Sequence, residues 1–233
     1  MDFVTTNNPD QLGPRVFVTD FDGTMTATDF FEVVLNHADL SSMPDYWGDC
    51  VAGRITHVEA LNGIFQHAPR DPAVLEAYMA EARLDPEAKP ALETLRRTGW
   101  DVVVVSAGSA WYIERLLRDV RHLLRIIANP GGFTPGQGLT MTWPPVDVPW
   151  YSHHFGVDKA AVVKHCEHSG AVVAFAGDGR PDLTAARIVR ENLRFARGWL
   201  AETLEREGLP FRRFERWSDI ATMLTDAQRL ADC

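Results

Sequence analysis

Three short runs of apolar, mostly β-branched residues set the strongest constraint on how this chain folds. They cover residues 15–20, 100–106 and 171–176. The first two end in Asp20 and Ser106, and Asp178 follows closely after the third. Strands that are apolar on both faces are typical of a parallel sheet covered by helices on each side. Because helical segments separate the runs, we predict an α/β fold with a doubly wound parallel sheet, in which ligands bind where these polar residues fall.

A long stretch with helical periodicity separates the first run from the second. Phe30, Phe31 and Val34 share one helical face, and several prolines punctuate the segment that follows. No convincing strand pattern occurs there, so we predict a small all-helical cap inserted after the first strand. The expected division is a cap over residues 29–96 and an α/β core of residues 15–28 and 97–233.

The composition excludes several classes of protein. Of 233 residues, 23 are Lys or Arg and 32 are Asp or Glu; the net charge of −9 disfavours a nucleic-acid binder with a basic face. The longest strictly apolar run has six residues, too few to span a membrane. The first residues lack the pattern of a secretory signal, and three widely spaced cysteines favour a reducing, cytoplasmic location. We expect a small-molecule partner, no nucleic acid, no membrane, and either a monomer or a homodimer.

The pair Asp20 and Asp22, just after the first strand, is the sharpest chemical signal. The two residues lie two positions apart, before a turn at Gly23, so both carboxylates can face one pocket. A carboxylate can attack a phosphoryl group and form an aspartyl-phosphate. A second carboxyl group can protonate the leaving oxygen and later activate water. The alternative interpretation is a solvated turn after a strand.

Asp178 and Asp182 follow the third apolar run. Asp178 would face the same pocket and supply a hard oxygen ligand, and Mg²⁺ favours a few carboxylates together with water and phosphate oxygens. Asp182 lies four residues later, in the first turn of an expected helix. It either supports the metal site or complements the positive end of that helix.

Ser106, Gly108 and Lys159 complete the candidate set. A hydroxyl and free backbone N–H groups at the start of a helix suit a phosphate, although Ser106 is also a natural N-cap. Lys159 begins a helix and could neutralise both Asp20 and a phosphoryl group. By itself, a lysine is usually solvated.

Together and in this order, these motifs resemble those of the haloacid dehalogenase-like phosphatase superfamily, over residues 16–182. The resemblance implies a Mg²⁺-dependent phosphatase that acts on a small phosphorylated metabolite through an aspartyl-phosphate. It implies that Asp20 is the nucleophile and Asp22 the general acid and base. The remaining implied roles are phosphoryl binding by Thr24, Ser106 and Gly108, charge pairing by Lys159, and metal binding by Asp20, Asp22 through its carbonyl, Asp178 and Asp182.

Within the superfamily the chain resembles the phosphoserine-phosphatase-like branch. It is similar there to the phosphatases of methionine salvage, on the stretches 20–26 and 55–65 and the pair Trp143-Pro144. That similarity implies a methylthio-keto-pentenyl phosphate or a similar monoester as substrate. Asp29 falls where the branch has an acidic residue on the substrate side, although it also suits an N-cap.

Two alternative functions stay open, a phosphoserine phosphatase and a phosphotransferase or mutase that uses the same aspartyl-phosphate. Phosphoserine phosphatases carry an arginine in the cap, whereas residues 55–65 contain none. A carboxylate without a bidentate partner is costly to bury, so we expect uncharged, hydroxylated or keto phosphates to be better substrates than phosphoserine.

Overall fold

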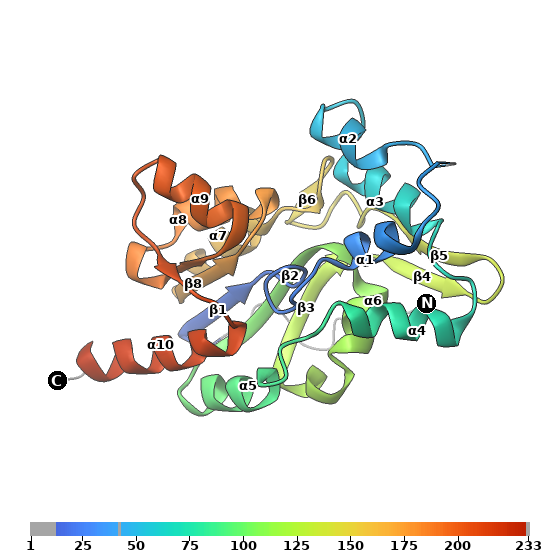
Figure 1. Cartoon of the computed structure of the whole chain (residues 1–233). Helices are drawn as coiled ribbons and strands as arrows, with labels where there is room; N and C mark the ends of the chain where they lie inside the picture. The colour runs from blue at the N-terminus through green and yellow to red at the C-terminus, as the bar shows by residue number, and fades with distance from the viewer. Residues whose placement is uncertain (1–12, 42, 232–233) are drawn as a thin grey trace.

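The computed structural model describes residues 13–41 and 43–231 of the chain, and its main feature is a six-stranded parallel sheet (Figure 1). The order is β10-β9-β8-β1-β2-β3, and every neighbouring pair is parallel. Its strands are β1 (Arg15–Thr19), β2 (Asp101–Ser109), β3 (Leu124–Asn129), β8 (Val172–Gly177), β9 (Arg194–Ala196) and β10 (Arg212–Arg213). This sheet confirms the predicted doubly wound α/β fold.

Helices and two small hairpins complete the architecture. The helices are α1 (Phe30–His37), α2 (Tyr46–Val51), α3 (His57–Phe65), α4 (Pro72–Glu81), α5 (Ala88–Arg97), α6 (Ala110–Leu116), α7 (Lys159–His168), α8 (Leu183–Ile188), α9 (Gly198–Arg206) and α10 (Trp217–Ala231). Short 3₁₀ helices cover Arg118–Leu123, Arg180–Asp182 and Glu191–Leu193. The antiparallel pairs are β4 (Gly131–Thr134) with β5 (Gly138–Met141), and β6 (Tyr151–Ser152) with β7 (Gly156–Val157). No helix in the described part of the chain combines the length and apolar character needed to cross a membrane.

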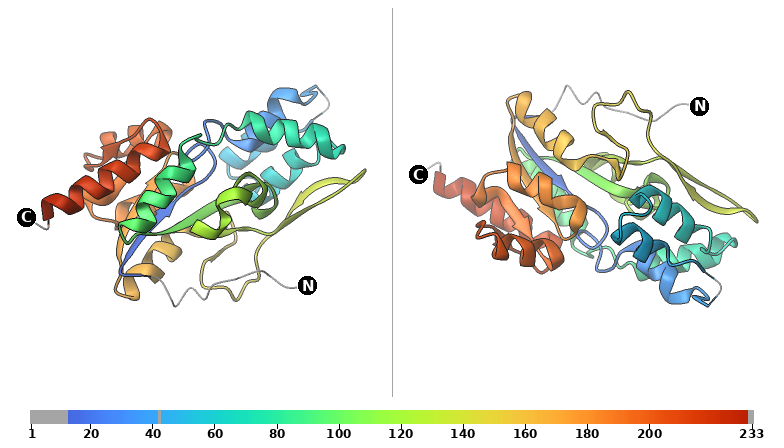
Figure 2. Two further views of the ribbon diagram at one scale, coloured as in Figure 1. Left: turned by 90° about the horizontal axis from the view of Figure 1, so that it is seen from below. Right: turned by 90° about the horizontal axis from the view of Figure 1, so that it is seen from above.

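Alternate side chains of each strand bury against different helices. Phe17 of β1 belongs to a core shared with α5, α6 and α10, whereas Val16 and Val18 belong to a second core shared with α7, α8 and α9. Figure 2 shows α5 and α10 over one face of the sheet and α7 to α9 over the other. Because both faces are covered, the strands are apolar throughout, as the sequence pattern predicts.

The chain reverses its winding direction at β1, which places a crevice at that strand. From β1 it proceeds through β2 to β3 on one side, and it later returns to β8 on the other side. Thr19 is level with Val104 of β2 and Ala176 of β8. The residues that follow these three strands therefore meet at one edge, where α/β sheets bind ligands.

Helices α1 to α4 lie beyond this edge of the sheet, in the region of the expected cap (Figure 1). Helix α5 differs from them, because it packs against β2 and α10 and covers the sheet. The cap range expected from the sequence, residues 29–96, includes most of α5. The amphipathic pattern of α5 does not tell which partner its apolar face contacts.

The boundary between β2 and α6 differs from the prediction. Ser106 does not open a helix, since β2 continues to Ser109 and α6 begins at Ala110. The N-cap is Ser109, whose side chain accepts a hydrogen bond from the backbone N–H of Trp111. The pairing of β2 with β3 shifts register between Val105 and Ser109, so residues 106–108 stay extended and lie against the crevice.

Arg194 of β9 holds together segments at Ala186, Val189 and Pro210, so its replacement tests this packing. It is 6% exposed, and its guanidinium donates hydrogen bonds of 2.6, 2.9 and 2.8 Å to the carbonyls of Ala186, Val189 and Pro210. Arg194→Met leaves these carbonyls without donors and should lower the free energy of unfolding by about 3 kcal/mol in urea titrations. The exposed control Arg118→Met should change it by less than about 0.5 kcal/mol. Equal unfolding midpoints for the two variants would contradict this role.

Candidate active site

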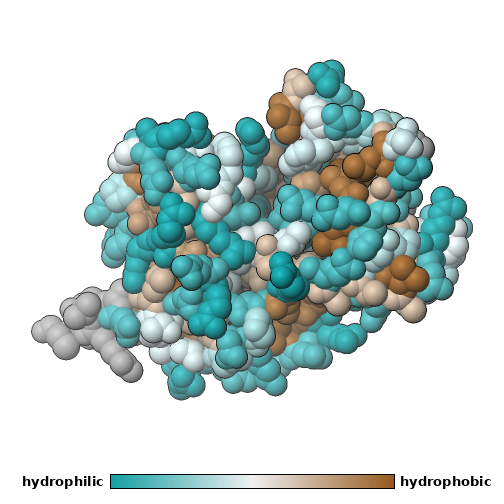
Figure 3. Space-filling model, viewed as in Figure 1, coloured by the Kyte–Doolittle hydropathy of each residue, from teal (hydrophilic) through white to brown (hydrophobic). Residues whose placement is uncertain are grey.

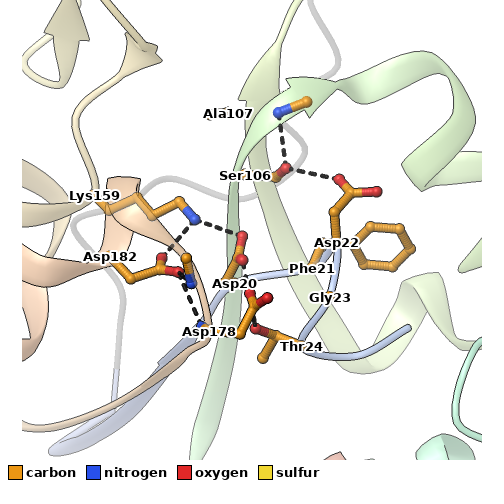
Figure 4. Close-up of polar contacts among 12 residues, drawn as sticks. Asp20, Phe21, Asp22, Gly23, Thr24, Ser106, Ala107, Lys159, Asp178 and Asp182 are labelled. Atoms are coloured by element: carbon orange, nitrogen blue, oxygen red, sulfur yellow. Dashed lines mark hydrogen bonds and ion pairs between the residues drawn. The ribbon is translucent and has the colours of Figure 1, made fainter. Parts of the chain in front are cut away.

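A buried lysine links two carboxylates at the centre of the crevice. The Lys159 ammonium donates hydrogen bonds of 2.5 Å to Asp20 and 2.6 Å to Asp182 (Figure 4). The side chains of Lys159, Asp20 and Asp182 are 2%, 8% and 0% exposed, so water screens none of these charges effectively. Asp20 follows β1, Lys159 begins α7, and Asp182 ends a 3₁₀ helix. Lys159 is thus paired and buried, and it is not a solvated lysine.

Asp182 uses both carboxylate oxygens in this arrangement. Oδ1 faces Lys159, and Oδ2 accepts hydrogen bonds from the backbone N–H groups of Asp178 and Gly179 at 3.1 and 2.9 Å. A side chain at Gly177 would place its Cβ 2.4 Å from the Asp182 carboxyl carbon, so the strand needs glycine there. From the sequence, Asp182 could either support the metal site or complement the positive end of a helix. These contacts favour the supporting role, because Asp182 holds Lys159 and the turn that carries Asp178.

Three carboxylates gather closely enough to hold a cation. Asp20, Asp178 and Asp182 each offer an oxygen, and these atoms lie within 4.8 Å of one another. The Thr24 hydroxyl bridges two of the residues, 3.0 Å from Asp178 and 3.4 Å from Asp20. Burial and repulsion from Asp182 raise the pKa of Asp178 to about 6. Hard oxygen donors with excess negative charge fit Mg²⁺.

Asp22 points away from this group, although it lies only two residues after Asp20 (Figure 4). Its carboxylate accepts hydrogen bonds from the Tyr112 hydroxyl at 2.6 Å, the Ser106 hydroxyl at 3.4 Å and the backbone N–H of Phe30 at 3.2 Å. Burial raises its pKa even though these donors favour the charged form. The carboxylate of Asp22 is therefore absent from the group that can hold a metal, and the expected ligand, its main-chain carbonyl, stays a prediction.

Ser106 and Gly108 line the pocket beside Asp22. The backbone N–H of Gly108 donates to the Ser106 hydroxyl at 2.9 Å. A Cβ on Gly108 would lie 1.9 Å from the Tyr112 hydroxyl and 2.8 Å from Asp22, so any side chain would displace the Tyr112–Asp22 contact. These positions suit the phosphate-binding roles expected for them. Thr24, by contrast, is 1% exposed and is not among the pocket-lining residues.

Asp29 also lines the pocket. It occupies the N-cap position of α1, but its side chain makes no capping hydrogen bond. Burial, together with repulsion from Asp22 and Asp178, raises its pKa well above the ordinary value. The backbone of Asp29 thus occupies the N-cap position, but its carboxyl group does not cap the helix and faces the pocket.

The cavity that holds these residues measures about 400 Å³ and extends toward α2 and α3. Figure 3 shows the surface hollowed between the part that contains α7 to α9 and the part that contains α2 and α3. His154 lines the cavity, whereas His153 stacks on Trp143 outside it. Beside the acidic and phosphate-side residues, the lining includes Phe31, Trp47, Cys50, Val51, His57, Leu61, Phe65, Tyr112, Phe155, Arg180 and Trp199.

Sequence reasoning missed several of these residues. Tyr112 lies on a helix after the motif, and nothing in its spacing marks it as a partner of Asp22. Arg197 had a usable signal, because it follows a strand end like Asp20 and Asp178 do. Its guanidinium donates to the carbonyls of Gly23 and Thr26 at 2.7 and 2.6 Å and so holds the turn after Asp22. Gly23 permits that turn with a φ of 66°.

Comparison with known proteins identifies the family of the chain. A model of the family described as haloacid dehalogenase-like hydrolase matches residues 17–187. A 2-hydroxy-3-keto-5-methylthiopentenyl-1-phosphate phosphatase from Brevibacillus brevis is 23% identical over 218 residues, which cover 92% of this chain and 96% of the relative.

Two solved structures share the fold. A HAD family hydrolase from Salmonella enterica serovar Typhi superposes with a TM-score of 0.62 at 16% identity, over 87% of this chain and 67% of that one. A phospho-aspartyl intermediate analogue of phosphoserine phosphatase superposes with a TM-score of 0.59 at 15% identity, over 88% of this chain and 95% of the other. At these identities the likeness establishes the fold.

The cluster of Asp20, Asp178 and Asp182 leads to a prediction about Mg²⁺ binding. Asp178→Asn removes one charged ligand and should weaken Mg²⁺ binding in isothermal titration calorimetry by about tenfold or more. In the unaltered protein, binding should weaken as the pH falls below about 6, because a proton then competes for Asp178. The exposed Asp119→Asn is the control and should bind as the unaltered protein does. Unchanged affinity in Asp178→Asn would remove Asp178 from the ligand set.

Proposed function

Since the chain belongs to the haloacid dehalogenase-like hydrolases, we propose that it is a phosphatase that releases phosphate from a small phosphorylated metabolite. The observation that carries this proposal is the contrast between Asp20 and Asp22 in one pocket. Asp20 pairs with the Lys159 cation, whereas Asp22 accepts hydrogen bonds from neutral hydroxyl groups. Two carboxylates in such different environments suit different roles in one reaction.

In the first step, an Asp20 carboxylate oxygen forms a bond to phosphorus and the ester P–O bond breaks. Asp22, whose pKa is raised by burial, gives its proton to the departing oxygen. The product at this stage is an aspartyl-phosphate on Asp20 and a free alcohol. Lys159 holds Asp20 in position and offsets negative charge during the transfer.

In the second step, Asp22 takes a proton from water as the water oxygen attacks phosphorus. The bond from phosphorus to Asp20 then breaks, and inorganic phosphate leaves. We assign phosphoryl binding to Ser106 and Gly108, because both line the pocket beside Asp22. Asp20, Asp178 and the carbonyl of Asp22 would hold Mg²⁺, supported by Asp182. When bound, the cation supplies charge neutralisation for the phosphoryl oxygens.

For the organic part of the substrate, we propose an uncharged group such as a methylthio-keto-pentenyl chain. The name of the Brevibacillus brevis relative describes such a substrate for that protein. Among the described residues that line the cavity, Lys159 and Arg180 are the Lys and Arg side chains, and neither belongs to helices α1 to α4. Arg54, the nearest arginine to the stretch 55–65, is exposed and pairs with Asp49. These observations support an uncharged organic group over phosphoserine.

Asp20→Asn should abolish phosphate release, because a carboxamide is a poor nucleophile. We expect a loss of at least about a thousandfold in kcat, measured as inorganic phosphate released with water as the only acceptor. The matched control Asp119→Asn, at an exposed carboxylate far from the pocket, should keep the full rate. If Asp20→Asn kept a tenth of the rate, the covalent mechanism would be wrong. Release that requires an added alcohol would favour a phosphotransferase.

Tyr112→Phe should move the acid limb of the kcat profile to higher pH. The Tyr112 hydroxyl stabilises the charged form of Asp22, so removing it raises the pKa of Asp22 further. Because Asp22 must be ionised to accept a proton from water, the rate should fall at a higher pH than in the unaltered enzyme. Tyr78→Phe, which removes a hydroxyl outside the pocket, should leave the profile in place. A superimposable profile for Tyr112→Phe would show that the contact does not tune Asp22.

A further inference from the structure

One part of the cavity has aromatic walls, which come from α1, α2, α3 and the turn before β7. Phe31 and Trp47 stack with ring centroids 4.4 Å apart. The His57 ring meets Trp47 edge-on at 5.7 Å and lies 5.6 Å from Phe155. Leu61 completes this group of cavity-lining side chains, which we call the aromatic compartment. Its apolar surface suits a carbon chain, a ring or a thioether, and offers little to a charged group.

His57 is the polar side chain of this compartment, and it lacks a hydrogen-bond partner. It is the first residue of α3 and is 8% exposed. Its Nδ1 is buried without a partner, and neither ring nitrogen forms a hydrogen bond with any residue in the described part of the chain. Nδ1 is closed off from the cavity, so the nitrogen that a ligand can reach is Nε2, whose hydrogen-bonding capacity the described residues leave unused.

The position of His57 is fixed by the start of its helix. Thr56 and Glu59 form a capping box, in which the Thr56 hydroxyl accepts from the backbone N–H of Glu59 and the Glu59 carboxylate accepts from that of Thr56. This reciprocal pair sets where α3 begins. The imidazole therefore sits on a rigid element, with its orientation set by Trp47 and Phe155.

The imidazole carries no charge near neutral pH. Burial, with repulsion from Lys159 and His154, lowers the pKa of His57 to about 3. A neutral imidazole offers one N–H donor and one acceptor nitrogen, which match a carbonyl or a hydroxyl group. It supplies no positive charge with which to balance a carboxylate.

Arg180 is the cationic alternative to His57 as the residue that recognises the organic group. It lines the cavity from the opposite wall, but it is exposed and its guanidinium lies 4.9 Å from the Trp199 ring centroid. An exposed cation interacts weakly with an anion because water and salt screen it. Geometry and burial thus favour His57 over Arg180.

We propose that the aromatic compartment binds the organic group of the phosphate ester in an uncharged, largely apolar form, and that His57 determines specificity by a hydrogen bond to one carbonyl or hydroxyl oxygen of that group. This inference rests on the proposed phosphatase function, because the phosphoryl end must lie at Asp20. It assigns a ligand class to residues that the chemical steps do not use.

The test compares three phosphate esters of similar length: pentyl phosphate, 2-oxopentyl phosphate and 4-carboxybutyl phosphate. Binding is measured by calorimetry with Mg²⁺ in the Asp20→Asn background, so that it does not depend on turnover. We expect 2-oxopentyl phosphate to bind about fivefold more tightly than pentyl phosphate, as one neutral hydrogen bond predicts. We expect 4-carboxybutyl phosphate to bind most weakly, since its carboxylate would be buried without a charged partner.

Variants of His57 then separate hydrogen bonding from packing. His57→Leu should abolish the preference for 2-oxopentyl over pentyl phosphate while pentyl phosphate binds within about twofold of its original affinity. His57→Gln keeps an uncharged donor and acceptor and should restore part of the preference. If His57→Leu fails to fold, His57→Gln provides the test instead, with a preference smaller than that of the unaltered protein as the expected result. His168→Leu, on the exposed side of α7, is the matched control and should leave the preference unchanged.

Three results overturn the inference. One is a preference for 2-oxopentyl phosphate that persists in His57→Leu. Another is that 4-carboxybutyl phosphate binds most tightly and loses this advantage in Arg180→Gln, which would assign the site to an anionic group. The third is equal binding of all three esters. A failure of the proposed function looks different: the esters bind with the expected order, which supports the compartment, but the unaltered protein releases no phosphate from 2-oxopentyl phosphate.

Discussion

The buried ion pairs of Lys159 are the interaction on which the rest of the site depends. Burial alone would lower the pKa of this lysine, but attraction from Asp182 and Asp20 raises it above its ordinary value, so the side chain stays protonated. The ammonium fixes Asp20 at the end of β1 and ties α7 to the 3₁₀ helix that carries Asp182. One cation does not balance the neighbouring carboxylates, because Asp178 lies in the same group. The same contacts therefore explain both the fixed position of Asp20 and why this group could hold a second cation.

The winding of the sheet is what allows this arrangement. Because β1 lies between β2 and β8, groups at or near the ends of three different strands face one crevice. Asp20 turns toward the side of β8 and α7, and Asp22 turns toward the side of β2 and α6 (Figure 4). Two carboxylates separated by one residue thus acquire different neighbours, a cation for one and neutral hydroxyl groups for the other. Such a difference is what the proposed division into nucleophile and general acid requires.

The β6–β7 hairpin, which carries Phe155, connects this chemical centre to the aromatic compartment. Asn129, at the end of β3, donates hydrogen bonds to the carbonyls of Ala107 and Phe155 at 2.7 and 2.9 Å. It thereby holds a wall of the compartment against the segment that carries Ser106. A Cβ on Gly156 would lie 1.9 Å from the Asn129 side-chain oxygen, which explains why glycine follows Phe155 in a turn with a φ of 76°. The aromatic compartment and the segment that carries Ser106 therefore share one anchor.

The sequence by itself determined the parallel sheet and the strand ends that carry Asp20 and Asp178, because uninterrupted apolar runs have few other places to be buried. The sequence also placed Ser106 next to the site, but the start of the following helix was predicted wrongly. Ser106 and Ser109 are equally good N-caps, and only the register shift of β2 against β3 distinguishes them. No sequence pattern marked Tyr112 or His57. Tyr112 contacts Asp22 across 90 residues of sequence. His57 stands out because its Nδ1 is buried without a hydrogen-bond partner. Local pattern thus specified the elements and their polar ends. Only tertiary packing decided which carboxylate meets the lysine, which carboxylate meets the hydroxyl groups, and which buried polar atoms lack a partner.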